Sequence, residues 1–87
     1  MNRTTSVNLL LAFGLVVKGL RQSKGLSQEK LAELAQIHRT YVGDVERGTR
    51  NIALLNMAKL ASGLAVPLSK LIRETERRIA RHPRISH

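Results

Sequence analysis

Residues 27–48 carry apolar side chains at three- and four-residue spacing, and this spacing is interrupted once, at Gln36 and Ile37. The pattern predicts two amphipathic helices of about two turns each, joined by a tight turn. Helices connected so closely must cross, which is the scaffold of a helix-turn-helix. The residues expected to pack together beneath the turn are Leu31, Ile37, Val42 and Val45, with the small Ala32 at the crossing point.

Local signals predict three further helices and their ends. Ser6 is expected to cap a first helix that ends near Gly25, Ser27 to cap the second, and Gly48 to stop the third, which opens at His38. Two more helices are expected over 54–64 and from Pro67 onward. The expected apolar stripe of the first helix is Leu10, Phe13, Val17 and Leu20. That of the fourth helix is Met57, Ala58, Ala61 and Leu64, and that of the fifth is Leu68, Leu71 and Ile72.

The length of 87 residues leaves room for one hydrophobic core. With one Phe, one Tyr and no Trp, that core must be built from Leu, Val, Ile and Ala, which favours helices. We therefore predict an all-α fold, a compact five-helix bundle that forms a single domain over residues 1–80. Residues 81–87 are expected to be a basic, disordered tail.

Charge limits the choice of partner. Fifteen Lys and Arg against six acids give a net charge of +9, so the expected ligand is a polyanion, either nucleic acid or an anionic membrane. The apolar run 9–17 is too short to span a membrane and is ended by Lys18. Because the chain has no cysteine, a reducing cytoplasm is the expected compartment.

The acids and histidines do not form a pattern that catalysis or metal binding requires. His38 stands at a helix start, where a capping role is more common than catalysis, and no second ligand lies at metal spacing. We expect no enzyme activity, no metal and no cofactor.

The segments SQEKLAELAQIHRTYVGDVERGTRN (27–51) and MAKLASGLAVPLSKLI (57–72) resemble the phage repressor and Cro family of helix-turn-helix regulators. The resemblance covers Phe13 to Ile72 and implies a lambda-repressor-like DNA-binding fold. Within the family, the segments RTY and ERGTRN are similar to the sequences of controller proteins of restriction–modification systems. The resemblance implies a transcriptional regulator that binds a two-fold double-stranded DNA operator as a homodimer.

Carried over by position, the resemblance assigns two kinds of DNA contact. Residues expected to read bases are Arg39, Thr40, Asp44 and Arg50. Residues expected to contact phosphates are Arg21, Lys24, Gln28, Tyr41, Arg47, Thr49 and Asn51. Arg21 and Glu46 match a family ion pair that bridges the first and third helices. Three roles stay open for Asp44: accepting from cytosine N4, repelling other DNA, or pairing with Arg47.

Two groups of apolar residues are candidate protein contacts. The expected dimer interface consists of Leu64, Val66, Leu68 and Ile72, although these residues could instead close the monomer core. Leu11 and Leu15 lie opposite the apolar stripe of the first helix and suggest a further interface. Alternatives to an operator-binding regulator are an antitoxin-type autoregulator with a protein partner and a basic helical module for membrane surfaces. A membrane partner is not favoured, because the first helix carries few Lys and Arg.

The chain departs from the family pattern at two positions. Gln36 stands in the turn where the family usually has Gly, so a left-handed backbone there costs about 1 kcal/mol. Ala53 stands where the fourth helix usually has a Ser or Asp cap, so that cap must come from Asn51 or be missing.

Overall fold

Local sequence signals set most of the helix boundaries in the structure, a computed structural model that describes residues 3–81. Ser27 caps the second helix, and its hydroxyl accepts a hydrogen bond from the Lys30 amide at 2.9 Å. Gly48 ends the third helix in the left-handed region, at φ 71°. The five helices are α1 (Arg3–Ser23), α2 (Gln28–Ala35), α3 (Arg39–Arg47), α4 (Leu54–Gly63) and α5 (Leu68–Arg81).

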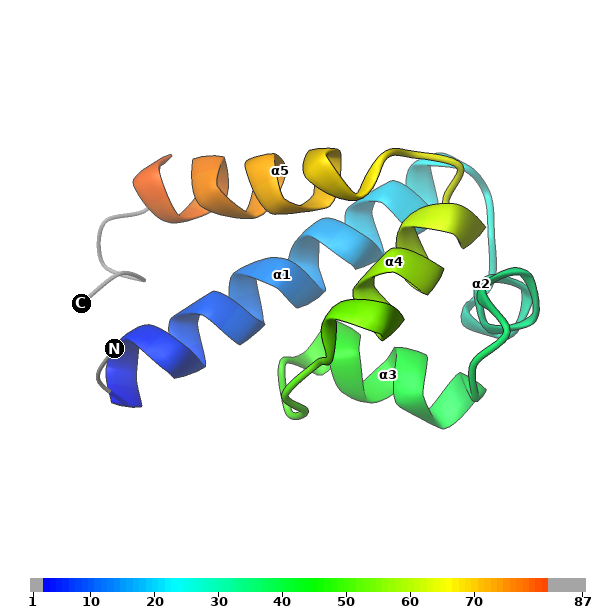
Figure 1. The fold of residues 1–87 in the computed structure, drawn as a ribbon, viewed down its shortest axis with the longest axis horizontal. Helices are drawn as coiled ribbons and strands as arrows, with labels where there is room; N and C mark the ends of the chain where they lie inside the picture. Colours follow the sequence, from blue (N-terminus) through cyan, green and yellow to red (C-terminus); the bar gives the residue numbers. More distant parts are fainter. Residues whose placement is uncertain (1–2, 82–87) are drawn as a thin grey trace.

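The predicted all-α class is confirmed, since residues 3–81 form helices, turns and loops without a strand. Helix α1 runs through the middle of the molecule, with α5 on one side and α3 on the other (Figure 1). Helix α2 packs against α3 and α4, and α4 also contacts α5. Helix α3 and the basic helix α5 therefore lie on opposite sides of the fold. None of the described helices is both long and apolar enough to cross a membrane.

The core lies beneath the turn, as predicted. Leu31, Val42 and Val45 are buried, Ala32 is buried at the crossing, and Ile37 packs partly buried against them. Two glycines allow close helix contacts that the sequence analysis missed. A Cβ on Gly14 of α1 would collide with the backbone of α3, and a Cβ on Gly63 of α4 would lie 3.1 Å from the Ala35 side chain of α2.

Several local predictions were wrong. Helix α1 begins at Arg3, so Ser6 lies inside the helix and is not its cap. In α4, Ala58 is exposed and Leu60 is fully buried, because the buried face follows Met57, Leu60, Ala61 and Leu64. Helix α5 is described as far as Arg81, and residues 82–87 lie outside the described residues, so the domain bounds 1–80 and the tail 81–87 stay predictions.

Candidate nucleic-acid interface

The turn between α2 and α3 depends on a strained residue. Gln36 has φ 59° and ψ 44°, the left-handed conformation expected of it, and its amide donates to the carbonyls of Ala32 and Glu33. The next amide, that of Ile37, donates to the Ala32 carbonyl at 3.0 Å. This backbone reversal sets the angle at which α3 leaves α2. Ala65, between α4 and α5, also has a positive φ, 57°, which was not anticipated.

A buried polar network joins three helices behind α3. Arg21 Nε of α1 donates to Glu46 Oε2 of α3 at 2.6 Å, and Arg21 Nη2 donates to Glu46 Oε1 at 3.0 Å. Gln28 Nε2, at the start of α2, also donates to Glu46 Oε1 at 3.0 Å. The side chains of Arg21 and Glu46 are 11% and 3% exposed, and the hydrogen bond to Glu46 raises the pKa of Arg21. The predicted ion pair is confirmed, and it fixes α3 relative to α1 and α2.

Burial changes the interpretation of two predicted phosphate contacts. Arg21 also donates from Nη1 to the Leu26 carbonyl at 2.8 Å, so each of its guanidinium nitrogens is engaged within the protein, and its phosphate contact remains a prediction. The partly buried Gln28 holds Glu46 through its amide nitrogen. A phosphate contact by Gln28 remains a prediction, for the second N–H of its side-chain amide and for the amino end of α2.

The first turn of α3 offers uncommitted polar side chains. Arg39 and Thr40 are exposed, and neither side chain hydrogen-bonds to another residue in the described part of the chain. His38 stands at the N-cap position, as expected, but its side chain makes no capping bond. Lys24, before α2, is also exposed. This arrangement leaves the amino end of α3 open for a ligand.

The carboxyl end of α3 is occupied by a charged cluster that we call the Asp44 clamp: Asp44, Arg47, Arg50 and Tyr41. Asp44 Oδ1 accepts from Arg47 Nη2 at 2.5 Å, and Oδ2 accepts from Arg50 Nε at 3.2 Å and Nη2 at 3.0 Å. The guanidinium carbon of Arg50 lies 4.9 Å from the centre of the Tyr41 ring. Hydrogen bonding to Arg50 lowers the pKa of Asp44. The pairing with Arg47 was one of the three roles left open, whereas the contact with Arg50 was not foreseen.

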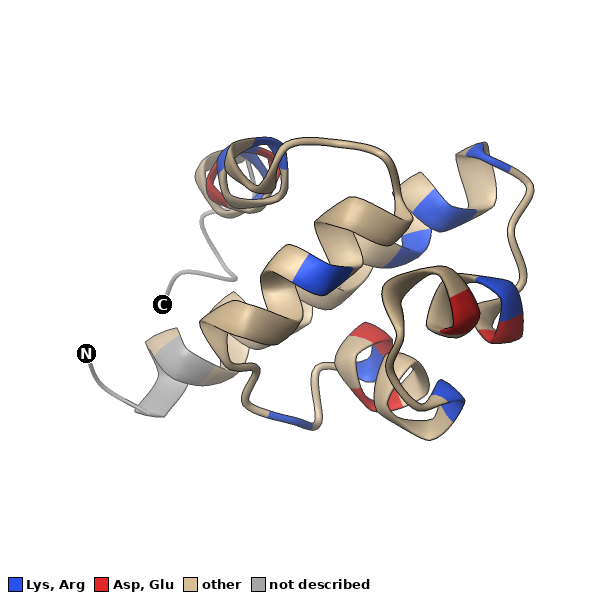
Figure 2. Ribbon diagram, turned by 45° about the vertical axis from the view of Figure 1, so that its right-hand side comes forward, with Lys and Arg blue, Asp and Glu red and all other residues tan. Residues whose placement is uncertain are grey.

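The surroundings of the clamp account for the remaining predicted contacts. Thr49 Oγ1 donates to the Asp44 carbonyl at 3.1 Å, and Asn51 is exposed in the loop before α4. Gly43 is buried, and the Arg47 side chain lies over it. Four of the six acids stand in α2 and α3, where Figure 2 shows bands of both signs, whereas α1 carries basic bands alone.

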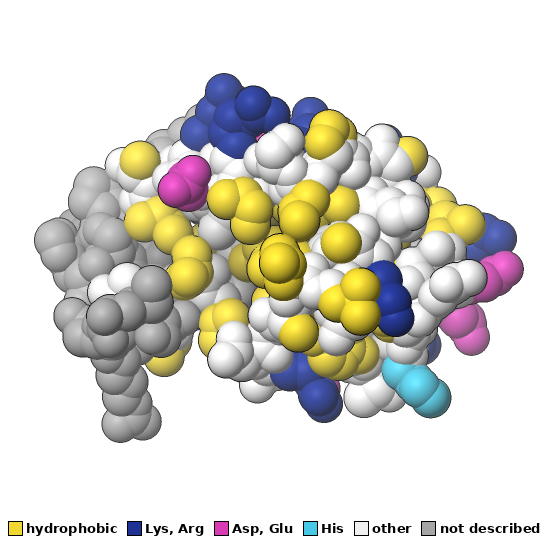
Figure 3. All heavy atoms as spheres, in the orientation of Figure 1, with side chains coloured by type: hydrophobic (Ala, Val, Ile, Leu, Met, Phe, Trp, Pro, Cys, Tyr) yellow, Lys and Arg dark blue, Asp and Glu magenta, His cyan; other side chains and the backbone are white. Residues whose placement is uncertain are grey.

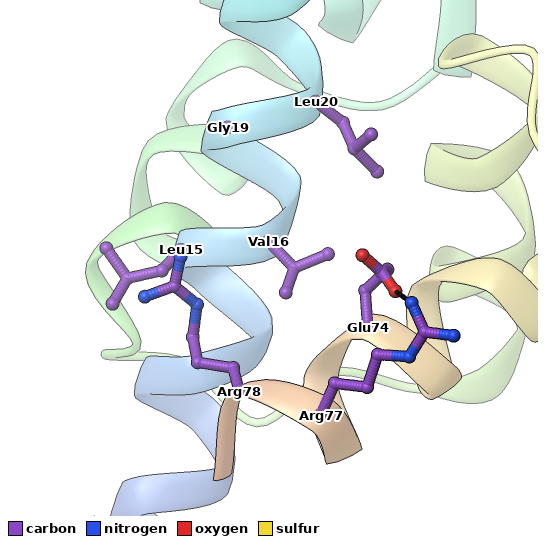
Figure 4. A pocket seen from close by; sticks show the side chains of 7 residues that line it. All are labelled: Leu15, Val16, Gly19, Leu20, Glu74, Arg77 and Arg78. Atoms are coloured by element: carbon purple, nitrogen blue, oxygen red, sulfur yellow. Dashed lines mark hydrogen bonds and ion pairs between the residues drawn. The ribbon is translucent and has the colours of Figure 1, made fainter. Parts of the chain in front are cut away.

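A groove of about 200 Å³ lies between α1 and α5, away from α3. Its apolar floor comes from Leu15, Val16 and Leu20, with Gly19 leaving space beside them (Figure 4). Glu74 and Arg77 pair at 3.0 Å on the opposite wall. Leu11 and Leu15 are exposed, as the sequence suggested. No cluster of three or more His, Cys, Asp or Glu suited to a metal occurs among the described residues.

An apolar surface spans the border of α4 and α5. Of the four predicted dimer contacts, Leu64 is fully buried in the monomer core, so it cannot reach a partner. Val66 and Leu68 are half-buried and Ile72 is 39% exposed. Leu54 and Leu55, at 65% and 66%, are more exposed and were missed. Figure 3 shows hydrophobic side chains gathered in the centre of this face, beside a hollow of about 280 Å³ lined partly by Leu10, Phe13, Met57 and Ile72.

Known proteins match this chain in sequence over most of its length. The family described as helix-turn-helix matches residues 17–71. The control protein C.BamHI of Bacillus amyloliquefaciens is 47% identical over 66 residues, which are 75% of this chain and 82% of that protein. The control protein C.MunI of a Mycoplasma species is 38% identical over 71 residues, covering 80% and 96%.

Solved structures share the same arrangement of helices. The restriction-modification controller protein C.AhdI from Aeromonas hydrophila aligns with a TM-score of 0.70 and 50% identity, covering 71% of this chain and 94% of that one. The wild-type restriction-modification controller protein C.Esp1396I aligns with a TM-score of 0.79 and 31% identity, covering 85% and 96%. These matches agree with the resemblance found in residues 27–51 and 57–72.

Proposed function

The chain belongs to the helix-turn-helix family, and from that premise we propose that it is a transcriptional regulator that binds a two-fold DNA operator as a homodimer. The observation that carries this proposal is the way in which the neighbouring helices hold α3 in place. Hydrogen bonds among Arg21, Gln28 and Glu46 tie the helix to α1 and α2 from behind, while Arg39 and Thr40 remain exposed at its amino end. A helix supported in this way, with free polar groups at its amino end, suits insertion into the major groove.

The proposed contacts divide into reading and positioning. Arg39 can donate two hydrogen bonds to O6 and N7 of guanine, and Thr40 can contact a neighbouring base. Lys24, Gln28, Thr49 and Asn51 are assigned to phosphates, which fix the register of the protein on DNA. The net charge of +9 supports a polyanionic partner of this kind.

The apolar surface on α4 and α5 is the proposed dimer interface. Leu54, Leu55 and Ile72 are large apolar side chains exposed there, and a group of such side chains is typical of an interaction surface. Val66 and Leu68 border it, and Leu64 supports it from the core. Two copies related by a two-fold axis would place two α3 helices in successive major grooves, about 34–36 Å apart.

The biological role that we propose is control of a restriction–modification system in the cytoplasm. Its support is the set of relatives named as control proteins, one of which is 47% identical over three quarters of this chain, and the fold shared with two controller proteins. The proposal includes no catalytic step.

Selection of bound sequences from a random DNA pool tests the proposed function. Two related half-sites about 10 base pairs apart are expected among the enriched sequences. Affinity for the selected operator should fall with salt, with a log-log slope of about 0.9 per phosphate contacted. A pool that stays unenriched, or a salt slope near zero, would contradict the proposal.

A further inference from the structure

We propose, building on the function above, that Asp44 is a specificity-determining residue that withholds Arg47 and Arg50 from random DNA and yields them to the cognate operator. The proposal begins from where the two arginines are held. Each carboxylate oxygen of Asp44 accepts from a different guanidinium, Oδ1 from Arg47 and Oδ2 from Arg50. Neither arginine is therefore a free cation in the unbound protein.

The exposure of the three side chains shows which of them faces the ligand. Arg47 and Arg50 are 62% and 49% exposed, whereas the carboxylate between them is 19% exposed. Approaching DNA meets the guanidinium groups first and the carboxylate last. Both carboxylate oxygens already accept from arginine, so reading of cytosine N4 by Asp44 would have to use an acceptor site that the two arginines leave open.

A second set of contacts keeps the guanidinium of Arg50 turned toward Asp44. The guanidinium of Arg50 lies over the Tyr41 ring, and Tyr41 Oη accepts from Asn56 Nδ2 of α4 at 3.1 Å. Thr49 is anchored to the carbonyl of Asp44 by both its amide and its hydroxyl. The loop after α3 thus keeps Arg50 against Asp44, and moving the arginine toward DNA means breaking several contacts together.

Asp44 and DNA compete as acceptors for the same arginine N–H groups, and this competition distinguishes the operator from random DNA. A phosphate offers an arginine an anionic acceptor, but Asp44 already supplies one, so random DNA gains less from Arg47 and Arg50 than their charge suggests. An operator gains more, because α3 seated in its major groove presents base acceptors such as guanine O6 and N7 in addition to phosphate. The hydrogen bond from Arg50 favours the charged carboxylate and lowers the pKa of Asp44.

Asp44→Asn tests the proposal in the full-length protein, with dissociation constants measured on the selected operator and on a scrambled duplex at several salt concentrations. We expect binding to scrambled DNA to tighten about three- to tenfold and its salt slope to steepen by about 0.9 to 1.8, for one or two freed arginines. Operator binding should change less, so the ratio of the two affinities should fall.

Glu74→Gln is the matched control. It also removes one acid that pairs with an arginine three residues away, on α5, on the side of the fold opposite α3. Since it adds the same net charge, it should move both affinities equally and by less than about twofold.

A second background separates the clamp from simple repulsion of DNA by Asp44. In a protein carrying Arg47→Gln and Arg50→Gln, the Asp44→Asn substitution should affect scrambled DNA no more than Glu74→Gln does. If it tightens binding there by more than that control, the carboxylate acts on DNA by itself and the clamp is wrong. Selective loss of operator binding by Asp44→Asn in the parent protein would show base reading instead. Thermal melts check folding, and Asp44→Ser replaces Asp44→Asn if the latter does not fold.

The two proposals fail in different ways. Absence of operator preference in the unmodified protein overturns the proposed function. Operator preference that Asp44→Asn and Glu74→Gln alter alike leaves that function standing and overturns the role of Asp44.

Discussion

Arg21 and Glu46 stand 25 positions apart in the chain, yet their side chains form a buried two-point ion pair between α1 and α3. Its place directly behind the recognition helix makes it a support for the DNA-binding surface. Glu46→Gln would leave the Arg21 charge buried without its anion. We expect a loss of about 3 kcal/mol in the free energy of unfolding, measured by urea denaturation.

Glu33→Gln is the control for that loss. Glu33 pairs with Lys30 at 3.6 Å on the exposed side of α2. Its removal should cost less than about 0.5 kcal/mol. Equal effects of the two substitutions would show that burial does not distinguish the pairs.

Gln36→Gly should relieve the left-handed backbone of the turn. The residue has φ 59°, and glycine adopts this conformation without a Cβ penalty, although it also adds entropy to the unfolded chain. A net gain of about 0.5 kcal/mol in unfolding free energy is expected, with DNA sequence preference unchanged. Gln22→Gly, within α1, should give no stabilisation, and a similar gain there would refute the explanation by strain.

Ala53→Ser should provide the missing cap of α4. Ala53 occupies the N-cap position with extended backbone and offers no side-chain acceptor. A serine hydroxyl there can accept from the first turn of the helix, which is worth about 1 kcal/mol. Ala58→Ser, on the exposed face of α4, should be neutral or slightly destabilising. Calorimetric melting temperatures compare the two variants.

Arg39→Ala should weaken the operator selectively. Its side chain is exposed and uncommitted in the first turn of α3, so its loss should cost about 1 to 3 kcal/mol on the operator and relax preference at one base pair in each half-site. Gln28→Ala should weaken operator and scrambled DNA alike. Titrations of both variants on both duplexes at one salt concentration decide the assignment, and the reverse outcome would exchange the two roles.

Ile72→Lys should dissociate the dimer. Ile72 is 39% exposed on the apolar surface of α4 and α5, and a charge buried there would be unpaired. Leu15→Lys is matched in exposure, at 41%, but lies on α1 beside the other groove. Sedimentation velocity should give a monomer for Ile72→Lys and a dimer for Leu15→Lys. The opposite pair of results would move the interface to α1.

Local chemistry made much of the fold predictable from sequence. Ser27 and Gly48 marked helix ends because a hydroxyl cap and a left-handed glycine act within one turn of the chain. The helix-turn-helix core followed from apolar spacing, and Gln36 and Ala53 were recognised as departures because their positions in the motif fix their backbone. The Arg21–Glu46 pair came from the family resemblance and could not have come from periodicity.

Contacts between distant elements required the tertiary structure. Gly14 allows α1 to approach α3, Gln28 donates to Glu46, and Arg50 returns from the loop to Asp44. Leu64 proved to be core, and Leu54 and Leu55 proved to be exposed. Residue type and spacing determine which face of a helix is apolar, but what covers that face depends on how separate helices are placed. The sequence therefore determined the helices and the motif, and the packing decided which charges and apolar groups remain free to bind.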